Sequence, residues 1–122
     1  NINVNSTTTI KFDRDMFHVI IRNIVSNAIK FSNRDSKIDI QSQISNDYTI
    51  LSITDYGVGI ESNLLSNIFD NSDKKGRVGT AGEKSTGLGL IICRDFMKMN
   101  GGSINIESED SKGTTVILKF NI

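Results

Sequence analysis

The sequence lacks the features of a disulfide-stabilised, membrane-spanning or nucleic-acid-binding protein. Its only cysteine, Cys93, excludes an internal disulfide framework and fits a reducing compartment. No apolar run approaches the roughly 20 residues that a membrane-spanning helix needs, and proline is absent. The 14 basic and 14 acidic residues are mixed along the chain, which argues against a broad nucleic-acid surface. The 122 residues suffice for one domain, which we expect to be part of a longer protein because the chain starts at Asn1.

The stretch Met16–Phe31 predicts an amphipathic helix that ends near Ser32, with Asp13 as its N-cap. At roughly 100° per residue, six apolar side chains form one stripe on this helix. They are Phe17, Ile20, Ile21, Ile24, Ala28 and Phe31. The stripe predicts that one face of the helix packs against a hydrophobic core.

One flank of that stripe carries Asn23, Asn27 and Lys30 at positions i, i+4 and i+7. Asparagine is a poor helix former, so a purely structural helix would more usually carry Glu or Lys there. Carboxamide oxygens can ligate a hard cation, and a lysine can meet a phosphate. For this helix taken alone, the alternative to a cation and phosphate site is that the two asparagines are structural residues at the edge of the core, with their hydrogen bonds satisfied.

Alternation of apolar and polar residues predicts two antiparallel hairpins. The first joins Lys37–Ile44 to Tyr48–Thr54, and the second joins Ser103–Ser108 to Thr114–Phe120. Thr8–Phe12 is rich in β-formers and predicts a short strand, whereas the polar residues 1–7 are expected to be loose.

The segment between the hairpins predicts two helices with a long loop between them. Glu61–Phe69 reads as a short helix, and Gly87–Asn100 as a longer one whose glycines leave amide groups bare at its N-terminus. Asp70–Thr86 has almost no apolar residues and is either a solvated surface loop or a lid over an anionic ligand. We expect Asn71–Ser85 to be mobile because nothing there can bury a core.

This order of elements predicts an α/β fold, a two-layer sandwich. One mixed, mostly antiparallel sheet would be covered by about three helices on one face. Directly after a predicted strand, Asp55, Gly57 and Gly59 form a D-x-G-x-G turn that lets the backbone approach a ligand closely. Standing alone, this motif is more often structural than functional.

Taken together, the motifs are specific. N-x-x-x-N-A-x-K-F on a helix, D-x-G-x-G after a strand, I-F-D, a glycine-rich loop and G-L-G-L on a helix follow in order. The chain thereby resembles the ATP-binding catalytic domain of sensor histidine kinases. The sequence of its glycine-rich loop resembles those of membrane-sensor and hybrid histidine kinases in particular. These belong to the Bergerat-type superfamily shared with gyrase, the mismatch-repair ATPases and the heat-shock chaperone. The resemblance runs from about Thr9 to Phe120 and so implies that residues 1–122 are one such domain.

The resemblance implies a role for each matching residue. Asn27 would coordinate Mg²⁺, with Asn23 as its partner one turn earlier, and Lys30 would reach the phosphates. Asp55 would accept a hydrogen bond from the exocyclic amine of the adenine of ATP. Further nucleotide contacts are implied at Gly57, Gly59, Ile60, Phe69, Gly87, Leu88, Gly89, Ile92 and Thr114.

Position 23 separates kinases from ATPases within this superfamily. The ATPases place a glutamate there as general base for water, whereas Asn23 cannot take up a proton. The resemblance therefore implies transfer of the γ-phosphoryl group to a histidine on a separate dimerisation domain. His18, the only histidine, is expected on the surface away from the nucleotide.

The resemblance also implies the setting. The expected partners are a dimerisation and phosphoacceptor domain and a response-regulator receiver domain, with no nucleic acid and a monomeric state for this domain. The expected location is the cytoplasmic side of an inner-membrane sensor protein. Two alternatives stay open: a serine kinase of the anti-sigma-factor type, and a degenerate module that binds nucleotide or docks partners.

Overall fold

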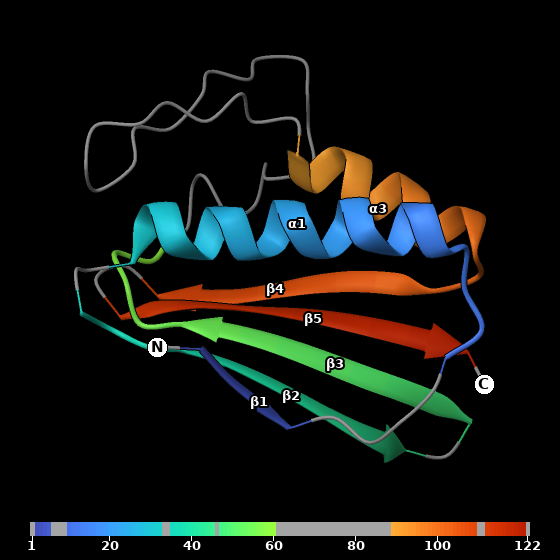
Figure 1. Cartoon of the computed structure of the whole chain (residues 1–122), viewed down its shortest axis with the longest axis horizontal. Helices are drawn as coiled ribbons and strands as arrows, with labels where there is room; N and C mark the ends of the chain where they lie inside the picture. The colour runs from blue at the N-terminus through green and yellow to red at the C-terminus, as the bar shows by residue number, and fades with distance from the viewer. Residues whose placement is uncertain are drawn as a thin grey trace.

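The computed structural model describes residues 2–5, 10–32, 35–45, 47–60, 89–109 and 112–121, the first of these ranges by its backbone only. Within them, two helices lie over one face of a sheet (Figure 1). The helices are α1 (Arg14–Phe31) and α3 (Gly89–Met99). The strands are β1 (Ile2–Asn5), β2 (Ile38–Ser45), β3 (Tyr48–Asp55), β4 (Ser103–Glu109) and β5 (Gly113–Asn121).

The described part of the sheet has the order β1-β2-β3-β5-β4. β1 runs parallel to β2, and the other neighbouring strands are antiparallel. The predicted two-layer sandwich with a mixed, mostly antiparallel sheet is therefore confirmed, as are both hairpins. The predicted third helix, Glu61–Phe69, and the loop Asp70–Thr86 lie outside the described residues.

The prediction for the first strand was wrong. The strand is Ile2–Asn5, within the stretch expected to be loose, and residues 10–12 are not in a strand. The physical reason is the packing of Phe12, whose ring meets Phe17 at 6.0 Å and Phe120 at 5.3 Å between centroids. This contact draws the chain out of the sheet plane towards the start of α1.

Helix α1 forms where the sequence predicts it. The Asp13 carboxylate accepts a hydrogen bond from the backbone N–H of Met16 at 2.9 Å, as an N-cap should. Its buried residues are Ile20, Ile24, Ala28 and Phe31, all on the predicted stripe. The helix therefore buries one face against the sheet and leaves the opposite face in solvent.

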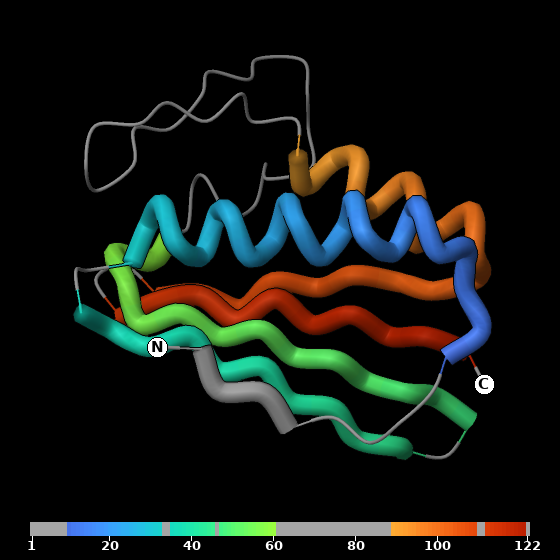
Figure 2. The backbone as a smooth tube through the Cα atoms, viewed as in Figure 1, coloured from blue at the N-terminus to red at the C-terminus, as the bar shows by residue number. Residues whose placement is uncertain are grey.

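The core lies between the helices and the sheet. On the helix-covered face, Ile40, Ile53, Val116 and Ile106 are directly opposite one another across four strands. Cys93 and Met97 of α3 complete this layer, each with no exposed surface. Figure 2 shows that the C-terminal ends of α1 and β3 lie at one end of the sandwich, whereas α3 ends at the other.

Candidate functional site

In the row of residues after this apolar layer, Ile38 of β2 is apolar, and the residues on the next three strands are polar. Asp55 of β3 pairs with Thr114 of β5, which in turn pairs with Ser108 of β4. Directly opposite residues in a sheet share a face, so these three side chains lie on the same helix-covered face as Ile53 and its neighbours. Asp55 is only 7% exposed. A buried carboxylate in a row of hydroxyls, at the end of a hydrophobic sheet, is a feature that folding alone does not require.

The turn that follows Asp55 is held against α1. The Asp55 carboxylate accepts a hydrogen bond from the N–H of Gly57 at 3.0 Å, and Val58 donates to the Phe31 carbonyl at 3.0 Å. A Cβ on Gly57 would lie 1.8 Å from the Phe31 carbonyl oxygen, so no other residue fits there. Gly59 has φ of 71°, in the left-handed region that favours glycine. The two glycines of the D-x-G-x-G motif are thus required by the backbone itself.

Ser108 ties this turn to the β4–β5 hairpin. Its hydroxyl oxygen lies 2.8 Å from each of three groups: the backbone N–H of Ile60, the carbonyl of Gly113 and the hydroxyl of Thr114. Our sequence reasoning missed Ser108. The alternation of β4 contained a usable signal, because Ser108 takes the position after Ile104 and Ile106 on the core-facing side.

Tyr56, in the middle of the motif, ties the turn to β2. Its hydroxyl donates a hydrogen bond to the Asp39 carboxylate at 2.8 Å, and Lys37 lies 5.3 Å from its ring centroid. The hydrogen bond to Asp39 raises the pKa of the exposed Tyr56 hydroxyl. With the contacts to Phe31 and Ser108, the turn is held from three elements.

The start of α3 lies against the asparagine flank of α1. A Cβ on Gly89 would lie 3.3 Å from the side-chain oxygen of Asn23, so this glycine permits close approach. The neighbouring Cys93 thiol donates to the Ile20 carbonyl at 3.6 Å. Burial raises the pKa of Cys93 to about 12, against the lowering effect of a hydrogen bond with Asn23. Asn23 therefore sits at the boundary between the two helices.

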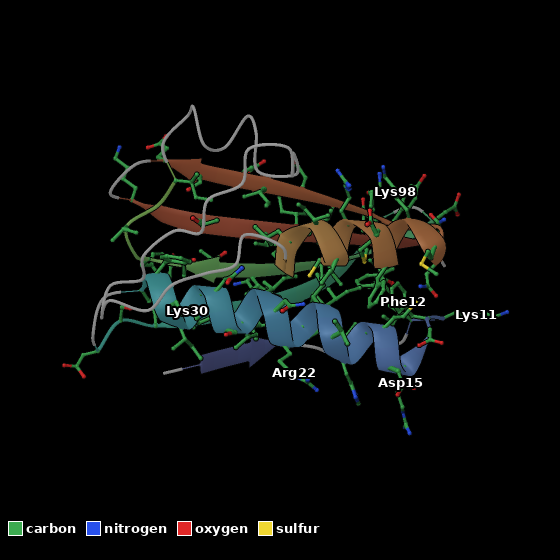
Figure 3. All side chains as sticks on the ribbon, turned by 90° about the horizontal axis from the view of Figure 1, so that it is seen from above. Lys11, Phe12, Asp15, Arg22, Lys30 and Lys98 are labelled. Atoms are coloured by element: carbon green, nitrogen blue, oxygen red, sulfur yellow. The ribbon has the colours of Figure 1, made fainter. Side chains whose placement is uncertain are left out.

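The other flank of α1 lines an open groove of about 600 Å³. Among the residues that the structure describes, its lining comes from α1: Phe17, His18, Ile21, Arg22, Val25, Ser26, Ile29 and Lys30. Most of these residues point away from Asn23, Val25 by about 200° around the helix, but Lys30 also belongs to the asparagine flank, so the two surfaces meet at Lys30. Lys30 lies near the C-terminal end of α1 (Figure 3). His18 is exposed, as expected.

The structure thus brings some of the predicted site residues together. Asp55, Gly57, Gly59 and Thr114 meet at one end of the sheet, and Asn23 meets Gly89 between the helices. The half-buried Asn27 follows Asn23 by one turn. Ile60 is buried in the core, whereas Ile92 on α3 is 38% exposed. Phe69, Gly87 and Leu88 lie outside the described residues.

The described residues contain no cluster of three or more His, Cys, Asp or Glu side chains that could hold a metal ion. Carboxamide oxygens, which Asn23 and Asn27 carry, are groups that can ligate a hard cation. Over the same part of the chain, no helix is both long and apolar enough to cross a membrane.

The two-layer α/β fold and the buried carboxylate beside a glycine-containing turn fit the class of ATP-binding sandwiches that the motifs resemble. Residues 12–122 match the family model described as histidine kinase-, DNA gyrase B-, and HSP90-like ATPase. The chain belongs to this family, and the resemblance stated from its motifs is confirmed.

Individual relatives agree. The sensor protein SrrB of Staphylococcus aureus is 36% identical over 109 residues, which are 89% of this chain and 19% of SrrB. A nucleotide-free catalytic domain of the histidine kinase ThkA is 27% identical, with a TM-score of 0.79 over 98% of this chain and 80% of that domain. The mycobacterial sensor histidine kinase MprB, 23% identical with a TM-score of 0.78 over 98% of this chain and 81% of its own, shares the fold.

Proposed function

We propose that this domain binds Mg-ATP and transfers its γ-phosphoryl group to a histidine on a separate dimerisation and phosphoacceptor domain. The observation that carries the proposal is Asp55, a buried carboxylate beside Thr114 in the polar row, next to a turn that only glycine can form. An adenine amine is a donor that such a carboxylate reads well.

Asn23 and Asn27 are proposed to hold the metal side of the nucleotide. Both belong to α1, one turn apart, and Asn23 reaches the start of α3. Carboxamide oxygens suit Mg²⁺, which keeps several waters and phosphate oxygens as further ligands. The ion supplies charge neutralisation for phosphoryl transfer when it is bound. Lys30 is proposed to reach the phosphates from the end of the same helix.

The amide of Asn23 also supports assignment of the domain as a kinase instead of an ATPase. An amide cannot accept the proton of an attacking water, so the domain would position ATP for an external nucleophile. His18 is a poor candidate for that nucleophile because it is exposed on the groove flank of α1. We place the accepting histidine on another domain, since this chain spans about one fifth of the relative SrrB.

The wider role follows as part of the same proposal. The domain would be monomeric by itself, dock on a phosphoacceptor domain of its own protein or dimer mate, and serve a response-regulator receiver domain. It would lie on the cytoplasmic side of a membrane-bound sensor protein. The supporting observation is the likeness to the sensor protein SrrB along 89% of this chain.

The test is thermal unfolding with and without Mg-ATP. A ligand at 100 times its dissociation constant adds about 2.7 kcal/mol of stability, so we expect a clear rise in melting temperature. Asp55→Asn should abolish the rise, because the amide nitrogen presents donors to the adenine amine. Asp47→Asn, the same change at an exposed residue between β2 and β3, should keep it. No rise in the unsubstituted protein at millimolar Mg-ATP would contradict the proposal.

A further inference from the structure

The hydrogen bonds of Ser108 admit only one arrangement of protons. A hydroxyl has one proton to donate and two lone pairs to accept with. The N–H of Ile60 can only donate, so it takes one lone pair of the Ser108 oxygen. The Gly113 carbonyl can only accept, so it takes the single proton of Ser108. What remains for Thr114, 2.8 Å away, is the second lone pair.

Thr114 must therefore donate its own proton to Ser108. Its oxygen is then left with lone pairs alone to offer towards a ligand. Asp55, its direct neighbour in β3, is an acceptor as well when ionised. The two side chains next to each other in the polar row consequently present acceptors and no hydroxyl donor.

We propose that Ser108 is a positioning residue that fixes the Thr114 hydroxyl as an acceptor and thereby makes the nucleotide site select a 6-amino purine over a 6-oxo purine. An adenine amine brings two N–H donors to such a surface, whereas a 6-oxo group brings a third acceptor. The inference rests on the proposed nucleotide site and adds to it a residue that contacts no ligand itself.

The same bonds position the turn. Ile60 is buried in the core, five residues after Asp55, and is the last residue of the described segment 47–60. Its N–H donates to the Ser108 oxygen, so loss of that oxygen would have two effects. It would remove a hydrogen bond that positions the turn, and it would leave the Thr114 proton without its acceptor. Both effects weaken binding of the 6-amino purine, and only the second improves binding of the 6-oxo purine.

The experiment compares ATP with inosine triphosphate, which carries a 6-oxo group in place of the amine. Dissociation constants in the presence of Mg²⁺ are taken from the dependence of melting temperature on nucleotide concentration. In the unsubstituted protein ATP should bind more tightly. Ser108→Ala should reduce the ratio of the two constants about three- to tenfold, the value of one neutral hydrogen bond. Thr114→Val should do the same.

Two variants serve as controls. Ser108→Thr keeps the hydroxyl and should keep the selectivity. Thr115→Val removes the neighbouring hydroxyl of β5, which pairs with Thr54 at 3.0 Å on the opposite face of the sheet, and should also keep it. A purely structural role for Ser108 would lower the melting temperature without changing the ratio.

The outcomes separate the two proposals. If neither nucleotide raises the melting temperature of the unsubstituted protein, the proposed function fails, and this inference fails with it. If ATP binds but Ser108→Ala and Thr114→Val keep the original selectivity, the inference alone is overturned. Should Ser108→Ala not fold, Thr114→Val decides.

Discussion

The two ends of the sandwich are built from the same strands but close in different ways. At the end where α3 stops, which Phe12 marks in Figure 3, the ring centroids of Phe12, Phe17 and Phe120 lie 5.3 to 6.0 Å apart. At the other end, Asp55, Thr114 and Ser108 occupy the corresponding core-facing positions. The polar side chains of the candidate site therefore occupy core-facing positions of the kind that aromatic side chains fill at the other end.

At the aromatic end, a side chain also makes hydrogen bonds to the backbone groups at the ends of the helices. The Asn100 side chain accepts from the Asp13 N–H at 3.2 Å and donates to the Phe96 carbonyl at 2.9 Å, which joins the end of α3 to the start of α1. At the polar end, glycine backbones make the corresponding contacts, Gly57 against Phe31 and Gly113 against Asp55. In the part of the chain that the structure describes, side chains join the elements at the aromatic end, whereas close backbone contacts join them at the polar end.

The largest effect on stability should come from Phe120→Ala at the aromatic end. Phe120 is 2% exposed, and removal of a buried ring costs about 3–5 kcal/mol. Chemical denaturation should show this loss, while the stabilisation by Mg-ATP in kcal/mol should stay as in the unsubstituted protein. Gln43→Ala, at an exposed position of β2, should change stability by less than about 0.5 kcal/mol. Loss of the nucleotide effect in Phe120→Ala would mean that the two ends are not independent.

A matched pair of glycines gives a sharper comparison. Gly57→Ala and Gly102→Ala both push a methyl group against a backbone carbonyl, that of Phe31 in one case and that of Lys119, at 2.5 Å, in the other. Each should destabilise the fold by about 1–3 kcal/mol or more. Only Gly57→Ala should also abolish stabilisation by nucleotide. If Gly102→Ala abolished it too, the assignment of the site to one end would be wrong.

The buried thiol of Cys93, between the two helices, should make the free energy of unfolding depend on pH. Burial raises the pKa of this thiol from 9.0 to about 12, so as the pH rises the unfolded chain loses the proton before the folded chain does. The stability due to the neutral thiol is complete below pH 9 and is lost as the pH rises from 9 towards 12. Between pH 8 and pH 10 the unsubstituted protein should lose about 1 kcal/mol more than Cys93→Ala, measured by denaturation. Equal losses would contradict the burial argument.

The smallest effect concerns the cap of α1 at the aromatic end. Asp13→Ala removes the acceptor for the Met16 N–H and should cost about 1 kcal/mol. Asp13→Asn keeps a capping oxygen and should cost much less. Stabilisation by nucleotide should be the same in both variants, since the cap lies at the opposite end of the helix from Lys30.

Much of this arrangement could be predicted from the sequence because it depends on local patterns. The alternation in both hairpins and the apolar stripe of α1 act over a few residues, and the structure confirms them. Asp55 and Gly57 belong to the D-x-G-x-G motif, and its glycines indicate in the sequence that the backbone turns tightly there. These features need no knowledge of which strands are neighbours.

What could not be predicted depends on register and on the backbone. Ser108 matters because it lies opposite Thr114, which follows only once the β4–β5 pairing is known. The Phe31 carbonyl that excludes a side chain at Gly57 leaves no mark in the sequence. The first strand was missed because Ile2–Asn5 alternates with asparagine, which is depleted in strands.

Helix α1 joins these two ends mechanically. It has 18 residues, contains neither proline nor glycine, and at 1.5 Å per residue measures about 27 Å. A kink in a helix needs one of a few specific causes, and proline and glycine, two of them, are missing here. One uninterrupted helix therefore carries Asn23 and Lys30 on the side of the polar end and Phe17, which packs on Phe120, at the aromatic end. The spacing between the proposed metal and phosphate contacts and the aromatic cluster is thus set by the geometry of a single helix.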